Sequence, residues 1–196
     1  MIPTGLFFGS FNPIHVGHLM LAQAALNFSD VDEVWFVVSP QNPFKQQADL
    51  APSEHRLRMA EIATGSDSRM SVSDVEMSLP LPSFTVRTLE KLRSDYPERE
   101  FSIIMGGDNL AGLPRWREPD EIVRHHRIVV YPRPGQSVDT SAVKALGGCV
   151  SILDAPQMDL SSTMLRCWIA EGRCIRHFVP SGVDDYIASN NLYVPR

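Results

Sequence analysis

Two histidines, His15 and His18, stand three residues apart in the stretch Gly9-Ser10-Phe11-Asn12-Pro13-Ile14-His15-Val16-Gly17-His18. An apolar run precedes this stretch and an apolar-periodic one follows it, so the pattern predicts a strand, a tight loop and a helix. The start of a helix presents unpaired N–H groups and a partial positive charge, which suit a phosphate group. A pair of histidines on one helix face adds further donors. The stretch therefore predicts a nucleotide-phosphate site in which chemistry occurs, whereas a single histidine is more often a residue with a local hydrogen bond.

The glycines and the proline of this stretch shape the predicted loop. Gly9 lets the backbone approach a ligand without an intervening side chain, and Gly17 keeps the face between the histidines clear. Pro13 pushes the preceding residue away from helical dihedral angles, which sharpens the turn. A phosphate charge about 4 Å from an imidazole contributes roughly 4 kcal/mol at an effective dielectric constant of ~20. That energy raises a histidine pKa by up to about three, so we expect a histidine beside ATP to be cationic at neutral pH.

A second set of phosphate-binding residue types follows Leu160, in the stretch Ser161-Ser162-Thr163-Met164-Leu165-Arg166. Hydroxyl residues at a helix start cap the helix and leave backbone N–H groups exposed. Arg166 follows Ser162 by four residues and Thr163 by three, so its guanidinium can return to the same face. Hydroxyls, amides and a forked cation together predict a phosphate clamp. The alternative is a plain helix cap beside a solvated arginine.

Other polar or aromatic residues have both a functional and an ordinary explanation. Lys45, in the stretch Asn42-Pro43-Phe44-Lys45, could bind a second phosphate or be solvated. Asp108, after a Gly-Gly turn, could bind a ribose or a metal, or cap the next helix. Trp116 could stack on an aromatic ring or belong to the core. Thr85 begins a predicted helix and could be only part of its cap.

The motifs that are missing from the chain narrow the chemistry. The sequence contains no Gly-rich dinucleotide fingerprint, no P-loop, no nucleophilic-serine motif and no zinc-protease motif. The remaining simple option is direct in-line attack of a bound acceptor on a nucleotide phosphate, with no protein nucleophile. Catalysis would then consist of positioning and charge stabilisation.

Composition excludes several other classes of protein. The net charge is −5, so no overall basic field attracts nucleic acid. The three cysteines show no paired spacing, which predicts neither a disulfide framework nor a zinc site and favours a reducing cytosol. No apolar run is long enough to span a bilayer and no signal peptide is recognisable. We expect a cytoplasmic protein with no membrane partner.

The elements that must position these residues alternate along the chain. The pattern predicts strands at residues 2–8, 33–38, 70–75, 101–105, 127–131 and 150–153, and helices at residues 15–28, 53–63, 84–96, 162–171 and 184–190. Because the strands are apolar on both faces, we expect an α/β fold: a Rossmann-like, doubly wound parallel sheet with helices on both faces. We expect a single domain over residues 1–196 with a helical C-terminal part over residues 160–196. The loops that follow the strands should converge at one edge of the sheet, and residues 132–141 are the best candidate for a mobile loop.

The histidine stretch and the Ser161–Arg166 stretch together resemble the nucleotidyltransferase superfamily that has a Rossmann-like core. Within that superfamily, the chain resembles the family of bacterial nicotinate-nucleotide adenylyltransferases. The residues that carry this resemblance are Trp116 and the stretch Met105-Gly106-Gly107-Asp108-Asn109-Leu110. The resemblance implies that nicotinate mononucleotide attacks the α-phosphate of ATP to give nicotinate adenine dinucleotide and pyrophosphate. It also implies Mg²⁺ bound through the ATP phosphates, with no metal-ligating side chain assigned.

The resemblance further implies roles for individual residues. His15, His18 and Arg166 would be catalytic, because they would hold the ATP phosphates and stabilise the charge of the transition state. Lys45 would meet the acceptor phosphate, Trp116 would stack on the pyridine ring and backbone amides near Thr85 would meet its carboxylate. The residues implied for ATP binding are Gly9, Ser10, Phe11, Gly17, Gly106, Asp108, Arg133, Ser162 and Thr163.

Two residues depart from the family pattern. Asn12 stands where the family commonly has aspartate, so a metal or cationic contact is not assigned there. Phe44 stands where it commonly has histidine, and a phenyl ring cannot donate to a phosphate. The alternatives are a related nucleotidyltransferase that uses nicotinamide mononucleotide or phosphopantetheine, a cytidylyl transfer, or a non-catalytic nucleotide-binding protein on the same fold. A homo-oligomer is a further expectation.

Overall fold

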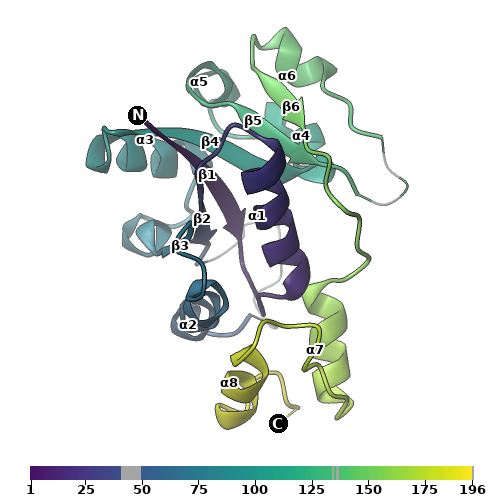
Figure 1. Ribbon diagram of the computed structural model, residues 1–196. Coiled ribbons are helices and arrows are strands. Elements are labelled where there is room, and N and C mark those ends of the chain that lie inside the picture. Colours follow the sequence, from purple (N-terminus) through teal and green to yellow (C-terminus); the bar gives the residue numbers. More distant parts are fainter. Residues whose placement is uncertain (41–49, 134, 136, 196) are drawn as a thin grey trace.

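A six-stranded parallel sheet lies at the centre of the protein (Figure 1). The computed structural model describes residues 1–40, 50–133, 135 and 137–195. The strands are β1 (Ile2–Gly9), β2 (Glu33–Val38), β3 (Met70–Ser73), β4 (Arg99–Gly106), β5 (Ile128–Tyr131) and β6 (Val150–Ile152). Their spatial order is β3-β2-β1-β4-β5-β6, in which the direction of winding reverses between β1 and β4. The predicted doubly wound α/β fold is confirmed.

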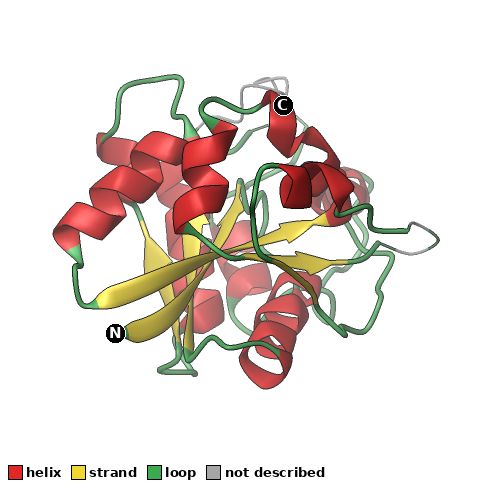
Figure 2. Ribbon diagram, turned by 90° about the horizontal axis from the view of Figure 1, so that it is seen from above, coloured by secondary structure: helices red, strands yellow, loops and turns green. Residues whose placement is uncertain are grey.

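Helices cover both faces of the sheet (Figure 2). One face packs against α1 (Val16–Phe28), α2 (Ser53–Thr64), α7 (Ser162–Ala170) and α8 (Val183–Ser189). The other packs against α3 (Thr85–Asp95), α4 (Gly107–Gly112), α5 (Pro119–His125) and α6 (Ser141–Ala145), and against the short 3₁₀ helices η2 (Val75–Ser78) and η3 (Leu113–Arg115).

Neighbouring residues of the central strands belong to opposite cores. Phe7 of β1 and Phe36 of β2 are paired in register and pack into the core beneath α1 and α2. Leu6 and Val37 pack into the core beneath α3 and α5. Because successive strand side chains alternate between the two faces, a strand buried on both faces must be continuously apolar. This is the property that made these strands predictable.

Four short helical elements were not predicted: α5, α6, η2 and η3. The helix α4 was considered only as one that Asp108 could cap. Each of these five elements is seven residues long or shorter, so its helical period is weakly marked in the sequence. α6, for example, buries only Val143. The predicted strand at 70–75 was too long, because β3 ends at Ser73 and η2 begins at Val75.

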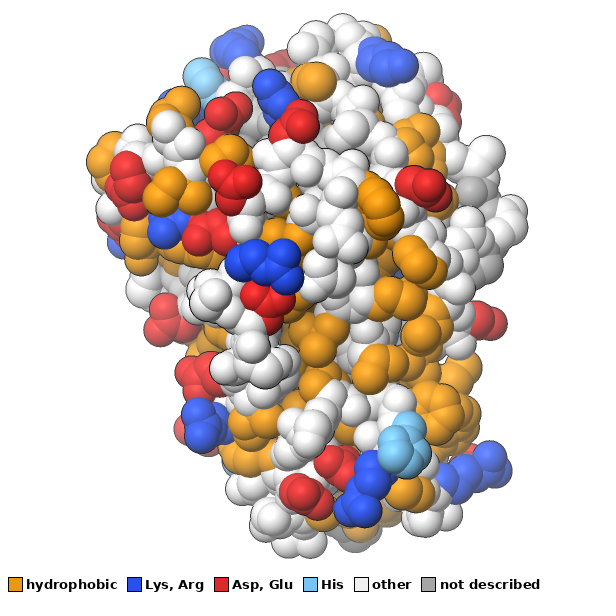
Figure 3. Space-filling view, in the orientation of Figure 1, with side chains coloured by type: hydrophobic (Ala, Val, Ile, Leu, Met, Phe, Trp, Pro, Cys, Tyr) orange, Lys and Arg blue, Asp and Glu red, His pale blue; other side chains and the backbone are white. Residues whose placement is uncertain are grey.

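The side of the molecule that carries α1 has apolar side chains gathered on its surface (Figure 3). In α1 only His18, Gln23 and Asn27 have polar side chains. The expected association of this chain into a homo-oligomer stays a prediction.

No helix in the described part of the chain is both long and apolar enough to cross a membrane.

His126, which follows α5, is buried and should make stability depend on pH. Its Nδ1 atom lies 2.9 Å from the carbonyl oxygen of Phe101, and burial lowers the pKa of His126 from 6.5 to about 4. The unfolded chain therefore takes up a proton at higher pH than the folded protein does. The contribution is fully present above pH 6.5 and is lost as pH falls through about 4, to a total of roughly 3 kcal/mol.

We expect His126→Asn, whose amide can still reach the Phe101 carbonyl, to lose free energy of unfolding less steeply than the wild type between pH 7 and pH 4. Urea denaturation at several pH values in this range measures the slope. His177→Asn is the control, because His177 is exposed. Parallel curves for the wild type and His126→Asn would contradict the assignment.

Candidate active site

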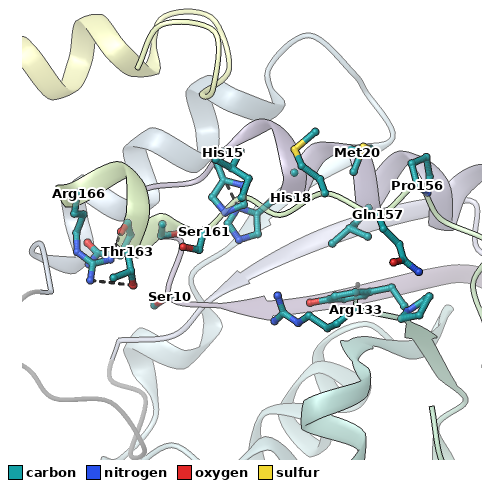
Figure 4. Close-up of a pocket in the computed structure, with 18 of the residues that line it drawn as sticks. Ser10, His15, His18, Met20, Arg133, Pro156, Gln157, Ser161, Thr163 and Arg166 are labelled. Atoms are coloured by element: carbon teal, nitrogen blue, oxygen red, sulfur yellow. Dashed lines mark hydrogen bonds between the residues drawn. The ribbon is translucent and has the colours of Figure 1, made fainter. Parts of the chain in front are cut away.

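The two predicted phosphate motifs meet in one cavity at the carboxyl edge of the sheet (Figure 4). The cavity has a volume of about 510 Å³. It is bordered by the loop after β1, the start of α1, the loop after β5 and the start of α7. The predicted site residues in its lining are Ser10, His15, Gly17, His18, Arg133, Ser162, Thr163 and Arg166. The structure therefore brings them together, while their contacts with a nucleotide stay predictions.

His18 is held in one orientation by its neighbours. The backbone N–H of His15 donates to Nδ1 of His18 over 3.1 Å, so the neutral ring of His18 carries its proton on Nε2. The two imidazoles stack with their centroids 3.7 Å apart, and the Phe11 ring contacts His18 edge-on at 5.1 Å. This arrangement assigns Nε2 as the donor atom of a pre-oriented imidazole.

His15 is a buried imidazole that is neutral at pH 7. It is the N-terminal cap of α1 and is 6% exposed. Burial, with a smaller contribution from the positive charge of Arg133, lowers the pKa of His15 to about 4. A nearby phosphate charge opposes this lowering of the pKa. A cationic histidine beside ATP stays a prediction, and for His15 the cost of burial works against it.

Hydrogen bonds join the second motif to the first. One Arg166 amino group donates to the backbone carbonyl of Asn12 at 3.0 Å, and the other lies 3.4 Å from Oγ1 of Thr163. The Ser162 hydroxyl donates to the backbone carbonyl of Pro13 at 2.9 Å. The start of α7 is thus fixed to the loop that precedes α1, and both halves of the predicted clamp form one unit.

Asn12, one of the departures from the family pattern, is a buried support of this unit. Its Oδ1 atom accepts hydrogen bonds from the Ala51 N–H at 3.1 Å and from the Tyr193 hydroxyl at 2.9 Å. Burial raises the pKa of Tyr193, so the hydroxyl stays protonated and donates. The side chain of Asn12 therefore connects the loop after β1 to the segment before α2 and to the C-terminal segment.

Phe11, predicted at the ATP site, contributes no side chain to it. The Phe11 side chain is 2% exposed and belongs to the core, which leaves only its backbone to contact a ligand. A Cβ atom at Gly9 would come within 2.8 Å of the Phe11 ring. The absence of a side chain at Gly9 therefore makes room for the Phe11 ring. The sequence alone assigned this glycine only to the approach of a ligand.

Gly106 and Asp108 were predicted on the adenosine side. Gly106 is the last residue of β4 and Asp108 lies in the first turn of α4, and neither lines this cavity. Asp108 is instead paired with Arg133, whose Nε atom lies 3.3 Å from Oδ1 of Asp108. A Cβ atom at Gly106 would come within 2.4 Å of the same oxygen. The pair places Arg133 at the cavity and the aspartate behind it.

The predicted acceptor residues Thr85 and Trp116 line a second cavity, of about 280 Å³. Ser10 lines both cavities, so the two cavities adjoin at the end of β1. Gly9 and the buried Glu76 also line the second one. Lys45 and Phe44 lie outside the residues that the structure describes.

Three supporting residues escaped sequence analysis: Arg56, Glu76 and Tyr193. A sequence pattern does mark Arg56. It is the first of four residues at helical spacing that α2 buries, namely Arg56, Met59, Ala60 and Ala63. A charge at the first position of an i, i+3, i+4, i+7 stripe indicates a buried and fully bonded cation. Glu76 and Tyr193 show no comparable pattern.

Comparison with known proteins agrees with the fold and the two motifs. The sequence model of the family described as cytidylyltransferase-like matches residues 6–168, and the chain belongs to that family. A probable nicotinate-nucleotide adenylyltransferase of Bacteroides fragilis is 49% identical over 180 residues, which are 92% of this chain and 88% of the relative. A protein of the same description from Flavobacterium johnsoniae is 43% identical over 96% of this chain and 97% of its own length. Within the wider family, the chain is therefore a member of the nicotinate-nucleotide adenylyltransferases.

Solved structures support the same fold at lower sequence identity. Plasmodium falciparum nicotinic acid mononucleotide adenylyltransferase, in a complex with NaAD, superposes with a TM-score of 0.80 at 21% identity, over 98% of both chains. A putative nicotinate-nucleotide adenylyltransferase from Vibrio parahaemolyticus has a TM-score of 0.72 at 18% identity, over 100% of this chain and 98% of that one.

Proposed function

We propose that the protein transfers the adenylyl group of ATP to the phosphate of nicotinate mononucleotide, giving nicotinate adenine dinucleotide and pyrophosphate. The observation that carries this proposal is the pair of adjoining cavities that share Ser10. One cavity holds the histidines and Arg166, which suit a triphosphate. The other holds Trp116 and the start of α3, which suit an aromatic ring with a carboxylate.

The proposed reaction is one in-line displacement. An oxygen of the acceptor phosphate forms a bond to the α-phosphorus of ATP, and the bond from that phosphorus to the bridging oxygen breaks, so that pyrophosphate leaves with the electron pair. The Nε2–H of His18 and the guanidinium of Arg166 would stabilise the negative charge that develops on the phosphate oxygens. Holding both substrates in adjoining cavities supplies the remaining rate enhancement by positioning.

Mg²⁺ would be held mainly by the phosphates of ATP. Within the described residues, no three His, Cys, Asp or Glu side chains lie together as a metal site. Mg²⁺ takes oxygen ligands and keeps several waters beside the substrate phosphates, and the hydroxyls of Ser10 and Thr163 are oxygen atoms in the lining of the first cavity. When bound, Mg²⁺ supplies charge neutralisation on the phosphates.

Pyrophosphate release with ATP and each candidate acceptor tests the proposal. We expect release with nicotinate mononucleotide, and less with nicotinamide mononucleotide or phosphopantetheine. Release with none of the three would overturn the proposed function. Titration calorimetry with ATP then identifies the second candidate, a non-catalytic nucleotide-binding protein, by affinity without turnover.

Trp116→Ala tests the assignment of the second cavity to the pyridine ring. We expect the KM for nicotinate mononucleotide to rise roughly tenfold, because a lost aromatic stack costs about 1 kcal/mol or more. The KM for ATP should change little, and Trp116→Phe should retain most of the acceptor affinity. Equal increases in both KM values, measured by steady-state kinetics, would contradict ring stacking.

A further inference from the structure

Glu76 is a buried carboxyl group in the wall of the second cavity. It lies in η2 and is 3% exposed. Its Oε1 atom accepts a hydrogen bond from the Thr88 hydroxyl at 2.9 Å, and its Oε2 atom accepts one from the Ser83 hydroxyl at 3.3 Å. Ser39, which follows β2, lines the same cavity.

No lysine, arginine or histidine of the described residues forms an ion pair with Glu76. Burial raises the pKa of Glu76, and hydrogen bonds from the hydroxyls oppose that rise. A buried acid without a cation is costly to the fold unless its hydrogen bonds are satisfied. The hydroxyl groups that bond to Glu76 satisfy this requirement, and they fix the position of its carboxyl group.

Both hydroxyl partners of Glu76 belong to the start of α3. Ser83 precedes α3 and Thr88 lies in its first turns. Ser83 lines the cavity together with Glu76. One carboxyl group of η2 thus holds the start of α3 beside the site.

Ser83 and Thr88 flank the start of α3, where Thr85 lines the cavity. Phe84 is the N-terminal cap of α3 and provides no side-chain hydrogen bond. The first N–H groups of the helix are therefore not occupied by their own cap, and such groups favour a carboxylate. Their direction depends on the two residues that Glu76 holds.

We propose that Glu76 is a positioning residue for the acceptor: it fixes the start of α3 against η2, so that the N–H groups near Thr85 meet the acceptor carboxylate. This inference rests on the proposed function, since it assigns the second cavity to nicotinate mononucleotide. Its effect should be confined to the acceptor, because neither Glu76 nor Thr88 lines the first cavity.

Glu76→Leu removes all the hydrogen bonds, and Glu76→Gln keeps an acceptor oxygen and a polar group of the same size. We expect Glu76→Leu to raise the KM and the calorimetric Kd for nicotinate mononucleotide about tenfold to a hundredfold, because the N–H groups at the start of α3 lose the position that suits the carboxylate. The KM for ATP and kcat should stay near the wild-type values. Glu76→Gln should restore most of the affinity, and Glu90→Leu on the exposed face of α3 should leave it unchanged.

An unchanged acceptor Kd in Glu76→Leu, or equal losses for ATP and acceptor, would overturn the inference. If Glu76→Leu does not fold, Thr88→Val combined with Ser83→Ala provides the same test, because it removes both hydroxyl donors. If the wild-type protein binds the acceptor but releases no pyrophosphate, the proposed function is contradicted and the comparison of Kd values still tests the role of Glu76. If the wild-type protein does not bind the acceptor, the proposed function and the role of Glu76 are both overturned.

Discussion

His18→Ala should lower kcat about 10²–10³-fold, the effect of removing one donor that stabilises a transition state. The expectation rests on geometry, since the His15 N–H donates to Nδ1 of His18 and so makes Nε2 the donor atom. The stacked His15 ring and the Phe11 edge hold this imidazole before any substrate binds. A donor held in advance needs no reorganisation during the reaction, so its loss should affect kcat more than the KM for ATP.

Initial rates of pyrophosphate release measure this effect. His18→Gln is the informative companion variant, because its amide nitrogen occupies nearly the place of Nε2 and can still donate. We expect it to retain more activity than His18→Ala, and His177→Ala, at an exposed position, to retain all of it. Unchanged turnover in His18→Ala would exclude His18 from catalysis.

The parts of the fold that could be predicted are those that local pattern determines. The central parts of β1, β2 and β4, at residues 6–8, 34–38 and 103–105, are continuously apolar, and helices cover both of their faces. The hydroxyl and arginine spacing after Leu160 predicted a capped helix, and Ser161 does accept a hydrogen bond from the Met164 N–H at 3.2 Å. Because parallel strands present their carboxyl ends at one edge, placing motifs after strands also predicted that they would converge.

The supports of the site could not be predicted, because they join residues that are distant in the sequence. The Tyr193 hydroxyl reaches Asn12 across 181 residues, and no local pattern encodes that contact. The pKa of His15 likewise depends on how deeply the folded chain buries the ring. Short elements such as α6 form through packing of one or two side chains, which propensity alone does not reveal.

Arg56 is the support with the largest expected effect on stability. It is 1% exposed, and its guanidinium donates to four backbone carbonyls, at distances of 2.7 to 2.9 Å. These belong to Ser10, Ser39, Pro40 and Ala51. The side chain therefore connects the loops after β1 and β2 to the segment that enters α2, and one of its partners, Ser10, lines both cavities.

Arg56→Leu should lower the free energy of unfolding by about 4 kcal/mol, because each buried carbonyl that loses its donor costs about 1–3 kcal/mol and water can reach some of them. Urea denaturation measures the loss. Arg58→Leu is the matched control on the same helix, since Arg58 is exposed and paired with Glu61, and such a pair contributes less than about 1 kcal/mol. Similar denaturation midpoints for the two variants would contradict the supporting role. A large loss confined to Arg56→Leu would show that an arginine on the apolar stripe of a helix stabilises the protein through the loops at the edge where the substrates are proposed to meet.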